Sequence, residues 1–581
     1  NTTGTANVAV GALAGDALTV GSSNVAIGYN SLSTEDGHGA NVAVGTNSLA
    51  VQNAGANGYN TAVGHNAGLS VTTAVETTLV GALAGDAITT GGYNTGFGSA
   101  ALGATTTATF NTAVGRNALG ANTTGASNVA VGGQALDANT TADNNTAVGT
   151  SSLGASTTGT SNTAVGQASL GSNTTASNNT AVGKGALTAN TTGTANTAVG
   201  TSALIANTTA NSNTAIGKDA LLANTTGTRN VGVGASALKT ITTASFNTGV
   251  GNDVLGANTS GASNTGIGDQ ALGANTTGAD NTAIGSGALD ANTTADGNTA
   301  VGSSCLGANT TGADNVAMGE AALLSNTTAA NNTGIGTSAL RANTTGTNNA
   351  SLGFSSLVAN TTGSNNTALG AYALDANTTA DNNIAIGTAA LGANTTGTEN
   401  TAVGSLSLAA NTTADNNEAF GYGALNVNTT GNNNSALGSL ALLDNTTGSS
   451  NVAIGRSALE NNTTADNNTA VGRSALKANT TGAINTGVGY LALAKCTTGS
   501  SNVALGYDTL GELTTASDNT AVGYAALQAS TSATGLAAFG KGALRVNTTG
   551  SNNTAVGQNA LVANTTGANN VALGGQALEA A

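Results

Sequence analysis

The residue types that most often carry out catalysis are scarce in this chain. Its 581 residues include two histidines, His38 and His65, and two cysteines, Cys305 and Cys496. No Ser/His/Asp or Cys/His set recurs at a spacing that one fold would bring together. We therefore expect a protein that is not an enzyme, with both histidines as isolated polar surface residues and the two cysteines too far apart to pair.

A second motif with chemical meaning is Asn-x-Thr, the acceptor sequence for N-glycosylation. It recurs at one corner of a repeat and includes Asn122, Asn139, Asn173 and Asn190. Asn and Thr are also common in plain turns. The favoured interpretation is an unmodified corner whose sequence recurs because the coil is repeated. Glycosylation of the corner is the alternative.

Carboxylates follow many of these corners in the phrase Thr-Thr-Ala-Asp-Asn-Asn. Examples are Asp143, Asp381, Asp415 and Asp466. Carboxylate and amide oxygens suit Ca²⁺, but one Asp in every other coil supplies few of the ligands that the ion needs. We expect no metal or cofactor, with calcium kept as an alternative.

All of these residues must be positioned by one repeat. The phrase Asn-Thr-Ala-Val-Gly, or a close variant, returns every 17 residues from Asn60 to Asn570, which gives 31 starts. Three earlier starts, Asn7, Asn24 and Asn41, bring the number of coils to 34, and the one irregular spacing is the 19 residues between Asn41 and Asn60. Self-similarity at a short fixed period is typical of a solenoid.

The pattern inside one coil indicates strands and corners. Counting the Asn as position 1, position 5 is always Gly, position 4 is always apolar, and position 9 is Leu in all but three coils. In Asn128–Gly132 the side chains of Val129 and Val131 share one face, and we expect a second short strand at 135–138. We predict an all-β parallel β-solenoid, or β-roll, with the position-4 and position-9 side chains inside.

Two positions carry the predicted architecture. The Gly of position 5 would turn a tight corner, where positive φ or close backbone approach excludes other residues; examples are Gly132, Gly149 and Gly166. The Asn of position 1 would form a side-chain amide ladder between coils; examples are Asn128, Asn145 and Asn162.

The array divides by regularity rather than by domain. We expect one continuous solenoid with less regular coils at 1–110 and regular coils at 111–581, cut in mid-repeat at both ends, so that the chain is a piece of a longer one. The residue after Asn-Thr-Thr is Gly or Ala, commonly in turn, as at Gly125 and Ala142. This alternation is consistent with duplication and with packing between neighbouring coils.

Composition limits the partners. A net charge of −15 argues against nucleic acid, whose phosphates need a basic surface, and no run of 18 apolar residues predicts a membrane helix. So small a coil buries little apolar area against the entropy of ordering 17 residues. We therefore predict self-association, as a homotrimer or filament, with a lone solenoid as the alternative.

The repeat of Asn128–Ala138, Asn-Val-Ala-Val-Gly-x-x-Ala-Leu-x-Ala, resembles the head repeats of trimeric autotransporter adhesins. The resemblance implies a left-handed parallel β-roll in which three chains pack side by side on a bacterial surface and bind host matrix or cells. Similar repeats occur in phage tail fibres. The expected function is a structural, adhesive extracellular fibre or surface appendage, at a cell surface or on a virion, with a surface glycan or protein as receptor.

Two other surface patterns suggest binding. Adjacent Thr residues at positions 13 and 14 resemble the Thr arrays of ice-binding solenoids, although adjacent residues on a strand point oppositely. Tyr side chains occupy position 6, where exposed aromatic rings can contact sugars or proteins; they are Tyr29, Tyr422, Tyr490, Tyr507 and Tyr524. An ice- or ligand-binding solenoid is thus an alternative function, and neutral surface variation is the favoured interpretation of the tyrosines.

Overall fold

The protein is a parallel β-solenoid, seen in a computed structural model that describes residues 2–580. These residues form 34 strands of three residues each, at repeat positions 2 to 4. They include no helix, and so none with the length and hydrophobicity that crossing a membrane requires. The chain divides into two compact units, Asn1–Thr294 and Ala295–Ala581.

The strands of the first unit are β1 (Val8–Val10), β2 (Val25–Ile27), β3 (Val42–Val44), β4 (Thr61–Val63), β5 (Thr78–Val80), β6 (Thr95–Phe97), β7 (Thr112–Val114), β8 (Val129–Val131), β9 (Thr146–Val148), β10 (Thr163–Val165), β11 (Thr180–Val182), β12 (Thr197–Val199), β13 (Thr214–Ile216), β14 (Val231–Val233), β15 (Thr248–Val250), β16 (Thr265–Ile267) and β17 (Thr282–Ile284). Those of the second unit are β18 (Thr299–Val301), β19 (Val316–Met318), β20 (Thr333–Ile335), β21 (Ala350–Leu352), β22 (Thr367–Leu369), β23 (Ile384–Ile386), β24 (Thr401–Val403), β25 (Glu418–Phe420), β26 (Ser435–Leu437), β27 (Val452–Ile454), β28 (Thr469–Val471), β29 (Thr486–Val488), β30 (Val503–Leu505), β31 (Thr520–Val522), β32 (Ala537–Phe539), β33 (Thr554–Val556) and β34 (Val571–Leu573).

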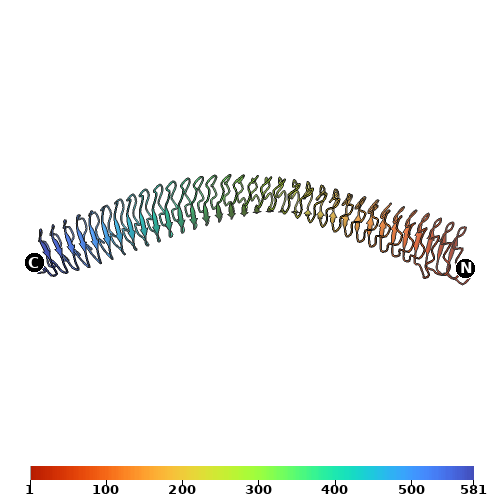
Figure 1. Ribbon diagram of the computed structural model, residues 1–581, viewed down its shortest axis with the longest axis horizontal. Coiled ribbons are helices and arrows are strands. Elements are labelled where there is room, and N and C mark those ends of the chain that lie inside the picture. Colours follow the sequence, from red (N-terminus) through yellow and green to blue (C-terminus); the bar gives the residue numbers. More distant parts are fainter. Residues whose placement is uncertain (1, 581) are drawn as a thin grey trace. The chain divides into compact units, whose positions relative to one another are not determined.

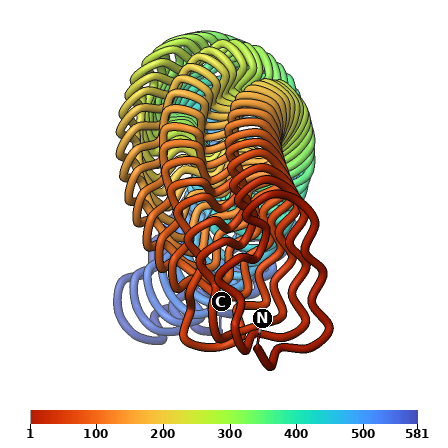
Figure 2. The backbone as a smooth tube through the Cα atoms, turned by 90° about the vertical axis from the view of Figure 1, so that its right-hand side faces the viewer, coloured from red at the N-terminus to blue at the C-terminus, as the bar shows by residue number. Residues whose placement is uncertain are grey.

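Within each unit, consecutive strands pair in parallel and in register. Val129, Ala130 and Val131 lie opposite Thr146, Ala147 and Val148 one coil later. Figure 1 shows the strands of each unit stacked side by side, and Figure 2 shows that successive coils repeat the same outline. The irregular spacing leaves the register intact, because Val42 pairs with Thr61 and the two extra residues stay outside the strands.

The side of each strand that faces the interior is the opposite of the one we predict from the sequence. Ala130, at position 3, is fully buried, whereas Val129 and Val131 are half-buried on the outer face. The prediction that the position-4 side chains are inside is therefore wrong, while the prediction for the position-9 leucines is confirmed, since Leu136 is fully buried.

Limited room at position 3 explains the inversion. A Cβ placed on Gly232 would already lie 3.4 Å from Cγ of Leu221, the position-9 residue of the preceding coil. Only a small residue fits beside that leucine. One coil has a large residue at position 3, Leu79, and its position 9 is then a glycine, Gly85. A Cβ on Gly85 would lie 2.7 Å from Leu79 Cδ2, so the two positions cannot both hold large side chains.

The prediction of a second strand at 135–138 is wrong. Residues 133–138 form turns, and both Gln134 and Leu136 have a left-handed backbone, with φ of 59° and 51°. A left-handed L-residue costs roughly 1–2 kcal/mol, which full burial of the leucine, at about 1.5–3 kcal/mol, offsets. Coil-to-coil bonding nevertheless continues, because Leu136 donates its N–H to Ser152 O over 3.0 Å.

The glycine corner is confirmed. Gly132 has φ of 139°, and a Cβ on it would lie 2.5 Å from the carbonyl oxygen of Gly149 in the next coil. Gly149 and Gly166 repeat this geometry, with φ of 134° and 132°. Positive φ and close approach of two backbones therefore act together at position 5.

The position-1 amides connect neighbouring coils, but at Asn128, Asn145 and Asn162 their bonds go to the backbone and not from amide to amide. Asn128 is fully buried; its Oδ1 accepts the N–H of Asn145 at 2.9 Å and its Nδ2 donates to Ala142 O at 2.8 Å. Asn145 and Asn162 make the same contacts in their own coils. Each amide thus joins its own coil to the next one and satisfies backbone groups that the narrow coil cannot pair otherwise.

The alternation of Gly and Ala at position 15 has a packing cause. A Cβ on Gly125 would overlap the carbonyl oxygen of Ala142, and one on Gly159 would overlap that of Ala176. In these coils the backbone of the next coil comes too close for any side chain. Packing between neighbouring coils therefore contributes to the pattern.

Candidate functional site

One surface that repeats in every coil is the outer face of the strands, which we call the strand face: the side chains of positions 2 and 4. Apolar position-4 side chains are exposed on it in both units, for example Phe97 at 55% and Leu437 at 52%. Among all residues at positions 2 and 4, Glu418 is the one charged side chain. The strand face thus combines an apolar column at position 4 with a column at position 2 that is Thr in 20 of the 34 coils, and it is almost uncharged on a protein of net charge −15.

One part of the strand face is hollowed. An open groove of about 520 Å³ runs over β25, β26 and β27, with Phe420, Leu437 and Ile454 as its apolar walls. Glu418 and Ser435 stand at its edge, where the Ser435 hydroxyl donates to Glu418 Oε2 over 2.9 Å. The groove offers shape and apolar contact but no array of polar groups that would fix a small polar substrate.

The Asn residues of the predicted glycosylation corner lie inside the coil. Asn122, Asn139, Asn173 and Asn190 are all fully buried. Asn139 donates Nδ2 to Asn122 Oδ1 at 2.8 Å and to Ala142 O at 3.1 Å. A glycan on that nitrogen would displace bonds that hold consecutive coils together. These residues therefore form a second amide ladder, at position 12, which the sequence did not suggest.

The corner aspartates have a structural role. Asp143 Oδ1 accepts the N–H of Ala126 in the preceding coil at 2.7 Å, and Asp415 and Asp466 make the same bond to Thr398 and Ser449. In other coils a Ser hydroxyl at this position accepts the equivalent hydrogen bond, as Ser177 does from the N–H of Thr160. Hydrogen bonding between coils thus accounts for the side-chain type here, and each carboxylate already has a use without calcium.

Three of the position-6 tyrosines form a continuous stack. The rings of Tyr490 and Tyr507 are 5.3 Å apart and those of Tyr507 and Tyr524 are 5.1 Å apart. Arg473 lies over Tyr490 and Lys541 lies over Tyr524, each 5.9 Å from the ring centroid. Because every ring face is covered by a neighbour, the stack presents ring edges and hydroxyls rather than a flat platform for a sugar.

Both cysteines are buried and free, so the prediction that they do not pair is confirmed. Burial raises the pKa of the Cys496 thiol to about 11 and also raises the pKa of Cys305. A thiol with a raised pKa is a poor nucleophile at neutral pH. Neither cysteine therefore resembles a catalytic residue.

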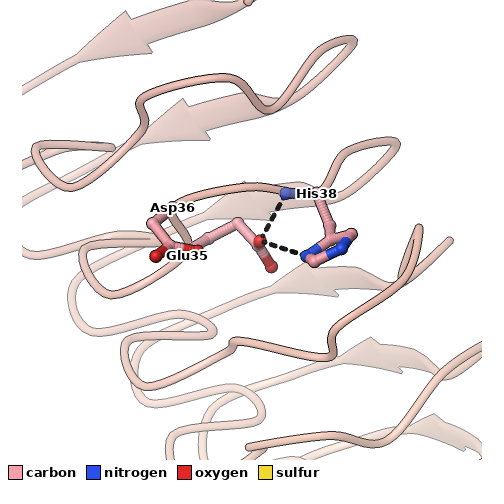
Figure 3. A group of neighbouring side chains, drawn as sticks. All are labelled: Glu35, Asp36 and His38. Atoms are coloured by element: carbon pink, nitrogen blue, oxygen red, sulfur yellow. Dashed lines mark hydrogen bonds and ion pairs between the residues drawn. The ribbon is translucent and has the colours of Figure 1, made fainter.

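The two histidines differ. His65 is exposed, as predicted, whereas His38 belongs to a cluster with Glu35 and Asp36 in the corner between β2 and β3 (Figure 3). Glu35 Oε1 accepts the N–H of His38 at 2.9 Å and lies 3.7 Å from His38 Nδ1. The interpretation of His38 as an isolated surface residue is therefore wrong.

The cluster is buried on one side. The side chain of Glu35 is 0% exposed and that of His38 is 32% exposed. Two buried atoms in it, Glu35 Oε2 and His38 Nδ1, have no hydrogen-bond partner. Loss of hydration raises the pKa of Glu35, and the nearby negative charge of Asp36 raises it further, whereas the N–H and the ring of His38 act in the opposite direction.

A signal for this cluster was present in the sequence. Glu35 stands at position 12, Asp36 at position 13 and His38 at position 15, where the regular coils have Asn, Thr and Gly or Ala. His38 is the single departure from Gly or Ala at position 15 in the array. Comparing each coil with the repeat would have marked this corner, whereas a search for catalytic sets passes over it.

Stacked coils, in-register parallel strands and buried amide ladders define the protein as a parallel β-solenoid with 17-residue repeats. No protein-family model matches the sequence, and no curated protein matches it. The fold and its surfaces are therefore the evidence from which function is inferred.

Proposed function

We propose that this protein is a structural shaft whose strand face packs against copies of the same chain, in a surface appendage outside the cell. The observation that carries the proposal is the strand face itself, which is nearly uncharged and repeats an apolar, partly exposed position-4 side chain in every coil. Buried amide ladders make the coil rigid, and the described residues bring no catalytic set together. Rigid support thus fits the molecule better than chemistry does.

The area of the strand face suits a stable interface. Each unit has 17 strands and therefore a column of 17 position-4 apolar side chains that are all at least partly exposed, a length of surface that suits the ~800 Å² per partner of a standard interface. A soluble monomer rarely exposes so long an apolar strip.

A second copy of this chain is the partner that matches the strand face best. The exposed side chains repeat at the spacing of parallel strands, about 4.8 Å. A partner must present apolar groups at that same spacing over many coils. Another copy of the chain does so because it has the same repeat. A closed assembly such as a trimer would cover the strip on every copy.

The repeat's resemblance to adhesin head repeats supports an adhesive appendage, and a phage tail-fibre shaft is the alternative. The two differ in where the chain is found. Antibodies against the protein should label intact source cells for an appendage and purified virions for a tail fibre; labelling of the cell interior alone would contradict both.

Sedimentation equilibrium of the full chain tests the shaft assembly. We expect a mass of three chains for the unmodified protein, and a mass of one chain for the double variant Leu437→Glu and Leu505→Glu, which places carboxylates at two exposed position-4 sites. Thr388→Glu, an exposed residue at position 6, is the matched control and should leave the assembly intact. A single-chain mass for the unmodified protein would refute the proposal.

A further inference from the structure

The corner between β2 and β3 departs from the repeat at three positions together. Glu35 replaces the amide of position 12, Asp36 replaces the Thr of position 13, and His38 replaces the Gly or Ala of position 15. Each change introduces a side chain that can bind a metal ion, and one donor atom from each lies within 4.8 Å of the other two. Independent surface drift does not explain why three donors fall in one corner.

Burial leaves two of these donors without a partner, whereas Asp36 is exposed. Glu35 Oε2 and His38 Nδ1 are both buried and neither has a hydrogen-bond partner. Both atoms carry lone pairs if the imidazole proton is on Nε2, so they cannot satisfy each other. Buried groups of this kind are costly unless a partner is supplied, and one cation between them would satisfy both.

We propose that Glu35, Asp36 and His38 bind a divalent first-row transition-metal ion such as Zn²⁺. A neutral imidazole nitrogen with two carboxylate oxygens is a donor set that suits such ions. Three protein ligands and a water molecule complete the four-coordinate geometry of Zn²⁺. Ca²⁺ suits the corner less, because it takes six to eight oxygen ligands and the imidazole contributes nitrogen.

The backbone around the donors is already fixed. The carbonyl of His38 accepts Nδ2 of Asn24 at 3.1 Å, and the carbonyl of Asp36 accepts the N–H of Thr19 at 2.9 Å. Only side-chain rotations are therefore needed to draw the donors onto bonds of about 2.0–2.2 Å. The bound ion would act as a clip between residues of one early coil, and this role is independent of the proposed assembly.

Isothermal titration of the chelator-treated full chain with ZnCl₂ tests the site. We expect one ion bound per chain, with CaCl₂ binding more weakly. Glu35→Gln and His38→Ala should each lower the Zn²⁺ affinity by roughly tenfold or more, since loss of even an outer-shell partner often costs that much. His65→Ala is the matched control, because it removes the exposed histidine and should leave the affinity unchanged.

Hydrogen exchange shows whether the variants keep the fold. Gln52 already occupies position 12 one coil later and is fully buried, so Glu35→Gln should preserve protection of the β2 and β3 amides. In the unmodified chain, Zn²⁺ should slow exchange at residues 33–40. Absence of Zn²⁺ binding, or binding that Glu35→Gln and His38→Ala leave unchanged, would overturn the proposal. Gln52 Nε2, which is buried without a hydrogen-bond partner, would then be the group left to pair with Glu35.

Discussion

The coils before Asn111 and the coils from Asn111 to the end of the first unit share most of their positions and differ in one column. Both sets have the position-5 glycine, the small buried residue at position 3 in nearly every coil, and the position-1 amide in all but one coil of the unit. At position 12 the later coils have a nearly unbroken Asn ladder, whereas the earlier coils have Leu18, Glu35, Gln52, Val71, Ile88 and Thr105.

This difference separates what the fold requires from what it tolerates. The position-5 corner brings two backbones together, so no other residue fits in either region. The position-12 column touches mainly its own neighbours along the axis, so an apolar column and an amide ladder can each satisfy themselves. A column that mixes the two kinds leaves orphaned groups: Glu35 and Gln52 have unpaired atoms in the early column, and so do Asn139, Ser156 and Asn224, where Ser156 and Ile241 interrupt the later ladder.

The largest expected effect tests the shared corner. Gly132→Ala would force φ near 139° on an alanine and bring its Cβ to 2.5 Å from Gly149 O. We expect a local loss of about 3 kcal/mol or more from strain and displaced bonding, measured by hydrogen exchange of β8 and β9. Gly133→Ala is the control, because nothing lies within 4 Å of a Cβ there; equal effects of the two would contradict the corner's role.

The next effect tests the Asn ladder against the apolar column. Asn207→Val would leave Asn190 Oδ1 without the 2.9 Å bond from Asn207, and Asn224 without its 3.0 Å acceptor. Asn224 Nδ2 keeps its bond to Gly227 O at 3.0 Å, so we expect a cost of about 1–3 kcal/mol, mainly from the unpaired Asn190 Oδ1, seen as faster exchange around β12 and β13.

The reciprocal change, Val71→Asn, should also destabilise its coil, because the new amide would replace apolar contact with Ile88 on one side and could pair only with Gln52 on the other. Asn178→Ser is the control for amide loss, since Asn178 is exposed and Ser161 occupies the equivalent position. If Val were tolerated at position 207, the two columns would be interchangeable and the comparison would fail.

A smaller effect concerns pH and the mixed column. Burial raises the pKa of Glu35, so the folded state binds this proton more tightly than the unfolded chain does. Its contribution to stability is therefore greatest below the ordinary pKa near 4.5 and falls as the pH rises through the folded value.

Glu35→Gln removes this dependence. In the presence of chelator, the variant should melt higher than the unmodified chain at pH 7, and the advantage should shrink at pH 4. Melting curves at the two pH values measure it. Asp36→Asn, which removes the neighbouring exposed carboxylate, is the matched control; an advantage of Glu35→Gln that grows on acidification would contradict the sign.

The smallest effect tests a regular surface column. Tyr507→Ala would break two ring stacks, of 5.3 and 5.1 Å, and each aromatic pair contributes about 0.5–1.5 kcal/mol. We expect a loss of about 1–2 kcal/mol in exchange protection near β30. Tyr422→Ala is the control, because the neighbouring position-6 residues are Ser405 and Ser439 and Tyr422 therefore has no ring to stack on in this column. An equally large loss for Tyr422→Ala would mean that ring stacking contributes no stability.

The sequence by itself determined the solenoid, its period, the glycine corner and the position-1 ladder. These follow from local rules that act identically in every coil: a Gly where φ must be positive, and an amide that meets its own copy one repeat later. The same periodicity indicated that the cysteines could not pair.

Only the tertiary structure decided which side of each strand faces inward. Alternation along a strand distinguishes two faces but not their direction, and Val129 and Ala130 are both apolar. The choice depends on the space left by Leu136 and its equivalents, which fold back with left-handed backbones instead of forming a second strand. Burial of the Asn139 column and the convergence of Glu35, Asp36 and His38 depend in the same way on how the corner closes, because contacts across a coil are set by packing and not by period.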